Sequence, residues 1–121
     1  MTIRWFEDIE AWQLARELTR IVYSVTRFHN FSKDTELKSQ IIKASTSSMH
    51  NIAEGFDGGT NSEFIRFLRY AQRSCTEVKS QLYVAIDQQY ISSEQFQALY
   101  DQASHTHAKI GGFIKYLNST L

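Results

Sequence analysis

Proline is absent from this chain of 121 residues, and cysteine occurs once, at Cys75. Proline would interrupt the interior of a helix, so its absence leaves long helices available throughout the chain. A single cysteine cannot form an internal disulfide, which excludes a small secreted scaffold held together by disulfides. Glycine is also scarce, with five residues. The pair Gly58-Gly59 lacks the Gly-Lys-Ser/Thr that completes a phosphate-binding loop.

Long hydrophobic runs are missing as well. No apolar stretch approaches the roughly 20 residues that a membrane-spanning helix requires, and the N-terminal residues lack the apolar core of a signal peptide. We therefore expect a cytoplasmic protein without a membrane partner. The length suits one hydrophobic core, and no linker or low-complexity tract divides the chain. We expect a single domain over residues 1–121.

Net charge is the next absence, because 13 basic and 13 acidic residues cancel. A neutral chain argues against strong nucleic-acid binding by bulk charge. The charge is nevertheless uneven. Between Phe64 and Lys79, four basic residues accompany a single acid, Glu77. An anionic partner would therefore meet this segment in preference to the C-terminal one.

The pattern that is present is helical. Apolar residues recur every three or four positions in four segments, which is the spacing of one face of an amphipathic helix. The segments cover residues 8–28, 34–55, 62–88 and 92–117. Short connections make sequential helices antiparallel neighbours. The sequence predicts an all-α fold, an up-down-up-down four-helix bundle.

Polar residues mark the expected helix ends. Asp8 is a candidate N-cap for the first segment, and Ser32 or Asp34 for the second. Residues 29–32 are expected to break the first helix, and Gly55 to stop the second. Capping boxes, in which Ser or Thr precedes Glu or Gln by three residues, open the last two segments at Thr60 to Glu63 and at Ser92 to Gln95.

No pattern in the sequence indicates catalysis, a cofactor or a metal. His105 and His107 are two residues apart, so on a helix they point to different sides and cannot share a metal ion. His107 falls on an apolar seam, where a partly buried histidine is the ordinary interpretation. Cys75 falls on the seam of the third segment, which favours a buried structural thiol over a nucleophile. We expect a protein that is not an enzyme.

Arginines form the strongest candidate for a functional surface. Arg66, Arg69 and Arg73 are spaced by three and four residues, so they share one stripe of the third helix, roughly opposite its apolar seam. Tyr70 lies beside the stripe and could stack on a base. A solvated outer face is the alternative interpretation. Further basic residues could extend the surface: Arg16, Arg20 and Lys43.

Asn51 and Glu54 flank an apolar pair near the end of the second helix, just before Gly55. We interpret them as a structural hydrogen-bonding site that holds the following turn, because one carboxylate without a partner makes a poor active site. On this interpretation Glu54→Ala lowers stability. Gly111-Gly112 weakens a helix, so we expect another backbone to approach closely there, in this chain or in a neighbouring subunit.

Aromatic residues are numerous, with eight Phe, six Tyr and two Trp. One four-helix core cannot easily bury them all, so we expect some to form an interface between copies of the chain. Capping of the bundle ends is the alternative. The candidates near helix ends are Trp5, Phe6, Trp12, Phe31 and Phe56.

Three motifs carry a resemblance to a known family. They are Phe6-Glu-Asp-Ile-Glu-Ala-Trp-Gln-Leu-Ala15, Asn51-Ile-Ala-Glu-Gly-Phe56 and Glu63-Phe-Ile-Arg-Phe-Leu68. With them the chain resembles the bacterial four-helix-bundle family encoded in intervening sequences of large-subunit ribosomal RNA genes. Relatives are accessory proteins of diversity-generating retroelements. Ser74, Glu77 and Gln81 also match positions where the family favours a small residue, an acid and a glutamine. The chain departs from the family in lacking a proline before Asn51 and in being less basic.

The resemblance implies a cyclic homo-oligomer, typically a pentamer, and for the retroelement relatives an adaptor that binds nucleic acid and a reverse transcriptase. We therefore expect an oligomeric bundle that binds RNA or DNA. The alternative is a protein-interaction or structural oligomer without nucleic-acid binding, which zero net charge favours.

Overall fold

The structure is a computed structural model, and it describes residues 3–120. A short 3-10 helix, η1, precedes four long α-helices and one short one, and no strand occurs within residues 3–120. The elements are η1 (Phe6–Asp8), α1 (Glu10–Thr26), α2 (His29–Lys33), α3 (Thr35–Asp57), α4 (Asn61–Asp87) and α5 (Ser93–Ser119). The all-α prediction is confirmed. No helix within the described range is long and apolar enough to cross a membrane.

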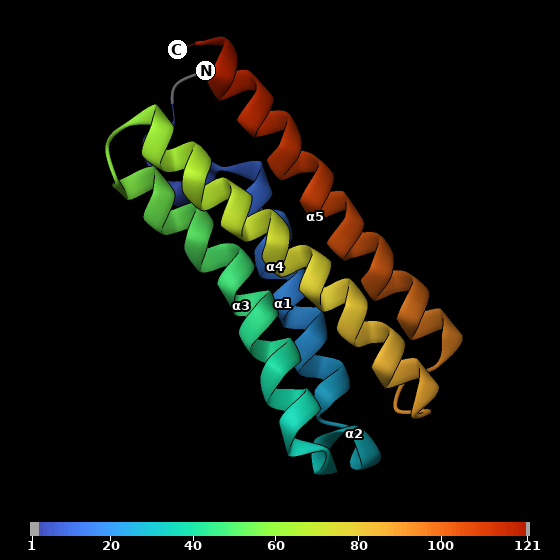
Figure 1. Ribbon diagram of the computed structural model, residues 1–121. Helices are drawn as coiled ribbons and strands as arrows, with labels where there is room; N and C mark the ends of the chain where they lie inside the picture. Colours follow the sequence, from blue (N-terminus) through green and yellow to red (C-terminus); the bar gives the residue numbers. More distant parts are fainter. Residues whose placement is uncertain (1–2, 121) are drawn as a thin grey trace.

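The four long helices pack lengthwise as a bundle (Figure 1). Helix α3 packs on α4 and α1, and α5 packs on α4 and α1. Helices α1 and α4 therefore occupy opposite corners of the bundle. Figure 1 also shows the described ends of the chain together at one end of the bundle and α2 at the other. This arrangement decides which side chains can share a surface.

Two predictions about the first helix were wrong. Asp8 is not its N-cap, because α1 begins after Ile9, whose extended backbone provides no side-chain cap. The expected break at residues 29–32 is instead the short helix α2. Phe31 explains the difference. Its side chain is fully buried and stacks on Tyr90 at 5.3 Å between ring centroids, which fixes this segment against the end of the bundle.

Gly55 does not stop its helix, contrary to the prediction. Helix α3 continues to Asp57, and the left-handed residue of the turn is Gly59, at φ 89°. Gly55 is buried where α3 meets α4. A Cβ atom at this position would lie 2.6 Å from the Cβ atom of Phe67, closer than real contacts. The glycine thus permits two helices to approach each other.

The other helix starts agree with the sequence. Asp34 caps α3, and its carboxylate accepts a hydrogen bond from the Leu37 N–H at 3.1 Å. Thr60 caps α4. The box that opens α5 is complete, since Ser92 and Gln95 each accept from the other's backbone N–H.

The core consists of two clusters along the bundle. One lies toward the α2 end and the other toward the end that holds η1 and the last turns of α5. The predicted seam of α4 is confirmed, because all of its members are buried: Phe64, Leu68, Ala71, Cys75, Val78, Leu82 and Ala85. In α5 the apolar seam passes through Thr106, which is buried, and not through its neighbour His107, which is half-buried at the edge of the core.

Candidate nucleic-acid interface

The three arginines of the predicted stripe on α4 have different surroundings, and Arg66 differs from the other two. The guanidinium group of Arg66 donates a hydrogen bond to the Glu63 carboxylate at 2.7 Å. It also lies over the rings of Phe67 and Tyr70, 5.3 and 5.8 Å from their centroids. The charge of Arg66 is therefore compensated within its own helix. Tyr70 serves as a platform for this arginine.

Arg69 and Arg73 lie apart from this pair, along a groove between α4 and α5. Gln72, Thr76 and His107 complete its lining, and its volume is about 340 Å³. None of these five residues is acidic. Neither arginine takes part in an ion pair with any residue of the 3–120 range. The groove therefore holds two uncompensated guanidinium groups.

His107 is the residue of this groove that α5 contributes. Its backbone carbonyl accepts a hydrogen bond from the Gln72 side chain at 3.3 Å. Gln72 also lies against Gly111, where a Cβ atom would be 3.0 Å from the Gln72 Nε2 atom. The predicted approach of another backbone is therefore not seen within residues 3–120, because Gly111 meets the end of a side chain of α4 and Gly112 meets nothing within 4 Å from outside its own turn of helix. Burial, and secondarily the charge of Lys79, lowers the pKa of His107 below its ordinary 6.5.

An aromatic cluster continues this face toward the other end of α4 and α5. The Lys79 ammonium group lies 4.7 Å from the centroid of the Tyr100 ring. Tyr83 and Phe96 pack edge-on at 5.0 Å, and Phe96 stacks on Tyr100 at 5.5 Å. Tyr83 keeps 53% of its surface exposed. Proteins that bind single-stranded nucleic acids use basic groups to contact phosphates and exposed aromatic rings to stack on bases, and this face offers both.

Part of this face was not predicted from the sequence. His107 was interpreted as a partly buried histidine on an apolar seam, and Lys79, Tyr83 and Tyr100 were not selected as candidate site residues. A signal existed, because Arg69, Gln72, Thr76, Lys79 and Tyr83 follow one another at intervals of three and four. That interval marks one side of α4. Only the packing of α5 beside it shows that this side borders a groove.

The other predicted basic residues lie elsewhere. Arg16 is on α1, with its guanidinium group 5.9 Å from the Trp12 ring, and Arg20 forms an ion pair with Glu17. Helix α1 lies at the corner opposite α4. Lys43 lines a different groove, between α1 and α3. The structure therefore does not bring these three residues to the surface that carries Arg69 and Arg73.

The motif around Asn51 also differs from its interpretation. The Asn51 amide donates to the Ser47 carbonyl and hydroxyl oxygens, at 2.9 and 3.0 Å. The Ser74 hydroxyl donates to the Ser47 hydroxyl oxygen at 3.0 Å. This network joins α3 to α4 and does not hold the turn at residues 57–60. Glu54 is exposed and has no hydrogen bond or ion pair within the described range, so we no longer expect Glu54→Ala to be strongly destabilising. Glu77 is exposed in a groove between α3 and α4.

The groups with catalytic potential are few. Within residues 3–120, no three His, Cys, Asp or Glu side chains come close enough together to hold a metal ion. Cys75 is buried, as predicted, and burial raises the pKa of its thiol to about 12. Such a thiol carries almost no thiolate at neutral pH and cannot act as a nucleophile.

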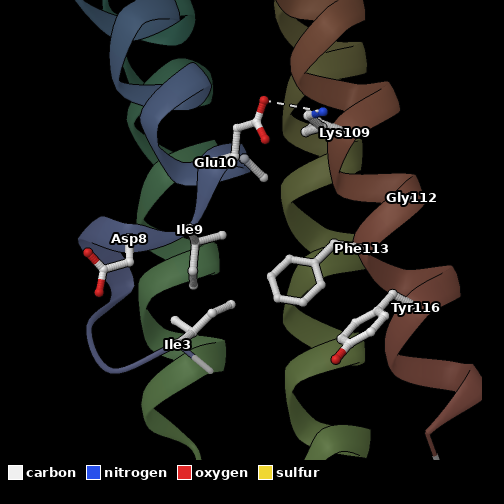
Figure 2. A pocket seen from close by; sticks show the side chains of 9 residues that line it. Ile3, Asp8, Ile9, Glu10, Lys109, Gly112, Phe113 and Tyr116 are labelled. Carbon is white, nitrogen blue, oxygen red and sulfur yellow. Dashed lines mark ion pairs between the residues drawn. The ribbon is translucent and has the colours of Figure 1, made fainter. Parts of the chain in front are cut away.

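A further hollow lies between the segment of residues 3–11 and α5 (Figure 2). It has a volume of about 370 Å³ and a mainly apolar wall that includes Ile9, Phe113 and Tyr116. Figure 2 shows the ion pair between Glu10 and Lys109 at its edge, with 3.2 Å between the charged atoms. Gly112 of α5 also lines this hollow, and a Cβ atom there would meet no atom within 4 Å from outside its own turn of helix.

Comparisons with known proteins agree with this architecture. The chain is similar in structure to a protein of unknown function from the S23 ribosomal protein family of Bacteroides thetaiotaomicron VPI-5482. The TM-score is 0.79 at 24% sequence identity, over 87% of this chain and 98% of the other. At that identity the similarity establishes the fold alone. No curated protein matches the sequence. Residues 7–112 match the family described as 23S rRNA-intervening sequence protein, and the chain therefore belongs to that family.

Proposed function

We propose that this protein is a non-enzymatic, up-down-up-down bundle that binds RNA or DNA as an oligomer in the cytoplasm. The observation that carries the proposal is the face of α4 and α5, where Arg69, Arg73 and His107 line one groove without an acidic residue. The exposed ring of Tyr83 continues this face. Phosphates would meet the guanidinium groups, and bases would stack on the rings.

A neutral chain can still bind a polyanion, because local potential depends on clustered charge and not on the total. Arg69 and Arg73 are free of internal ion pairs within the described range, whereas Arg66 and Arg20 are paired with acids of their own helices. Two such residues per copy give weak binding. Repetition around a ring of copies would strengthen it, and a pentamer is the assembly that the family resemblance implies. That resemblance also suggests a reverse transcriptase as a protein partner.

Contacts of this kind predict binding that is largely electrostatic and weakly specific for sequence. The family description connects these proteins with intervening sequences of 23S rRNA, so single-stranded RNA is the first probe. Double-stranded RNA and both forms of DNA follow as comparisons. Each phosphate contact contributes about 0.7 for a single strand, and about 0.9 for duplex DNA, to the slope of log affinity against log salt concentration.

The test compares two variants that remove equal charge from different corners of the bundle. Arg69→Ala with Arg73→Ala should weaken binding to unrelated sequences alike and reduce the salt slope for single-stranded RNA by about 1.4 per bound copy. Arg16→Ala with Arg20→Ala, on α1, should leave affinity nearly unchanged. Affinity would be measured by fluorescence anisotropy across a salt series. Equal losses in the two variants would contradict the assignment to the α4–α5 face.

A second candidate function is protein interaction without nucleic acid. Exposed apolar side chains favour it, because Phe28, Tyr83 and Val84 keep 59, 53 and 46% of their surfaces accessible. Wild-type protein that binds no probe even at low salt would reject the first function and support this one.

A further inference from the structure

A groove between α3 and α4 is lined by acids. Asp34 and Glu36 at the start of α3, and Glu77 on α4, border a space of about 470 Å³. No ion pair within the described range involves any of the three. The Asp34 carboxylate accepts from the Tyr90 hydroxyl at 3.0 Å and from the Leu37 N–H at 3.1 Å, and neither donor carries a full positive charge. The groove therefore has an unbalanced negative potential.

Gln81 in the same groove lacks a hydrogen-bond donor. Its side chain lines the groove and keeps only 8% of its surface exposed. Its Oε1 atom is buried and accepts no hydrogen bond from any residue of the 3–120 range. A buried acceptor without a partner is costly, and native proteins rarely leave one. Val84, 46% exposed, adds an apolar contact at the edge of the groove. A basic side chain from outside would supply the missing donor.

The neighbouring side of α3 has the opposite charge. Between α1 and α3, an open groove of about 540 Å³ is lined by Lys38, Lys43 and His50. These residues also take part in no ion pair within the described range. Tyr23 of α1 lies in this groove with 42% of its surface exposed. No acidic residue lines it. This surface is thus complementary to the acidic groove in charge, and each groove includes one exposed apolar or aromatic side chain.

We propose that the acidic groove between α3 and α4 binds the basic groove between α1 and α3 of a second copy of this chain. The inference rests on the assembly that forms part of the proposed function, and it names the two surfaces that build it. Lys38 or Lys43 of one copy would enter beside Glu36 and Glu77 of the next. One of these ammonium groups would donate to Gln81.

The placement of the two grooves decides the kind of assembly. They lie on adjacent sides of the bundle that share α3, and each is used once per copy. A contact between two different surfaces is head-to-tail, so every copy offers a free groove to the next. Because adjacent sides of a bundle face different directions, the chain of copies turns at each contact. Head-to-tail contacts form a ring where these turns close and a filament where they do not, and the proposed assembly is the ring.

Charge reversal tests the pairing of the two grooves. Glu36→Lys with Glu77→Lys makes both grooves basic, and Lys38→Glu with Lys43→Glu makes both acidic. Each double variant should associate at least about tenfold more weakly, because like charges then meet in the contact. The variant with all four changes restores opposite charges and should assemble again. Asp87→Lys with Glu94→Lys, which reverses two exposed acids outside both grooves, is the matched control and should keep the wild-type mass.

Mass would be measured by light scattering at about 0.1 M salt, where screening is moderate, with circular dichroism to confirm that each variant is folded. Wild-type protein at the 14.1 kDa of one chain would overturn the proposed assembly together with this inference. Wild-type oligomers that persist in both double variants would overturn the inference alone. A folded quadruple variant that stays monomeric would also reject it. So would loss of RNA binding in Lys38→Glu with Lys43→Glu at unchanged mass, because the basic groove would then belong to the nucleic acid.

Discussion

The helical glycines Gly55 and Gly112 differ in the space around their Cα atoms. At Gly55 a Cβ atom would lie 2.6 Å from the Phe67 Cβ atom and 3.0 Å from a ring carbon of Phe64, whereas at Gly112 it would meet nothing within 4 Å. Gly55→Ala should therefore destabilise the fold by about 1–3 kcal/mol through overpacking. Gly112→Ala should stabilise it by up to about 1 kcal/mol, because alanine favours a helix.

Urea unfolding at one fixed protein concentration would measure both changes, since the stability of an oligomer depends on concentration. The two variants add the same methyl group within a helix, so each is the control for the other. Equal effects would mean that contact with α4 does not explain the glycine at position 55.

His107 makes the proposed nucleic-acid binding dependent on pH. Burial, with a smaller effect from Lys79, lowers its pKa below 6.5, so the free protein favours the neutral imidazole. In the unfolded chain the same group takes up its proton at higher pH, so its contribution to stability is lost as pH falls below about 6.5. A phosphate in the groove would favour the charged form. Affinity for RNA should therefore rise as pH falls below about 6.5, by no more than about tenfold per pH unit for one proton.

His107→Gln tests this coupling, because glutamine does not titrate. The variant should lose the rise in affinity while still binding at pH 8 through Arg69 and Arg73. His105→Gln is the matched control, since His105 is exposed two residues away on the same helix. A rise in affinity that persists in His107→Gln and disappears in His105→Gln would mean that His105, and not His107, takes up the proton.

At the scale of the helices, local rules predicted most of what the structure contains. The seam of α4, the Asp34 cap and the box at Ser92 follow from spacing and capping within a few residues. The errors came from contacts between distant segments. Phe31 orders α2 by stacking on Tyr90, and Gly55 stays helical because α4 packs on it. No pattern of adjacent residues contains that information.

The candidate site shows the same limit. The sequence indicated Arg69 and Arg73, because an i, i+4 pair shares a face within one helix. The ion pair of Glu63 with Arg66, three residues apart on one helix, could also have been predicted from spacing and was missed. The sequence could not show that α5 brings His107 to the groove, or that α1 carries Arg16 and Arg20 away from it. Those facts depend on which helices are neighbours, and here each functional surface lies between two helices.

At the scale of the whole molecule, two proposals act together: the α4–α5 face meets nucleic acid, and grooves on both sides of α3 join the copies. These surfaces lie on different sides of the bundle, so assembly leaves Arg69 and Arg73 of every copy available. A long strand can then contact several copies at once. Binding to the second and later copies becomes intramolecular, which raises apparent affinity without any new kind of contact.

The ring should therefore bind a long single-stranded RNA far more tightly than a short one of the same composition. Wild-type protein should gain about 100-fold or more in affinity between a strand that covers one face and a strand that reaches several. Glu36→Lys with Glu77→Lys, if monomeric as expected, should show only the small gain that comes from having more sites per strand, even though it carries more positive charge. The quadruple variant that reassembles should recover the large gain. Affinities measured for both lengths at one salt concentration separate assembly from charge, because a gain that followed net charge would be largest in the double variant.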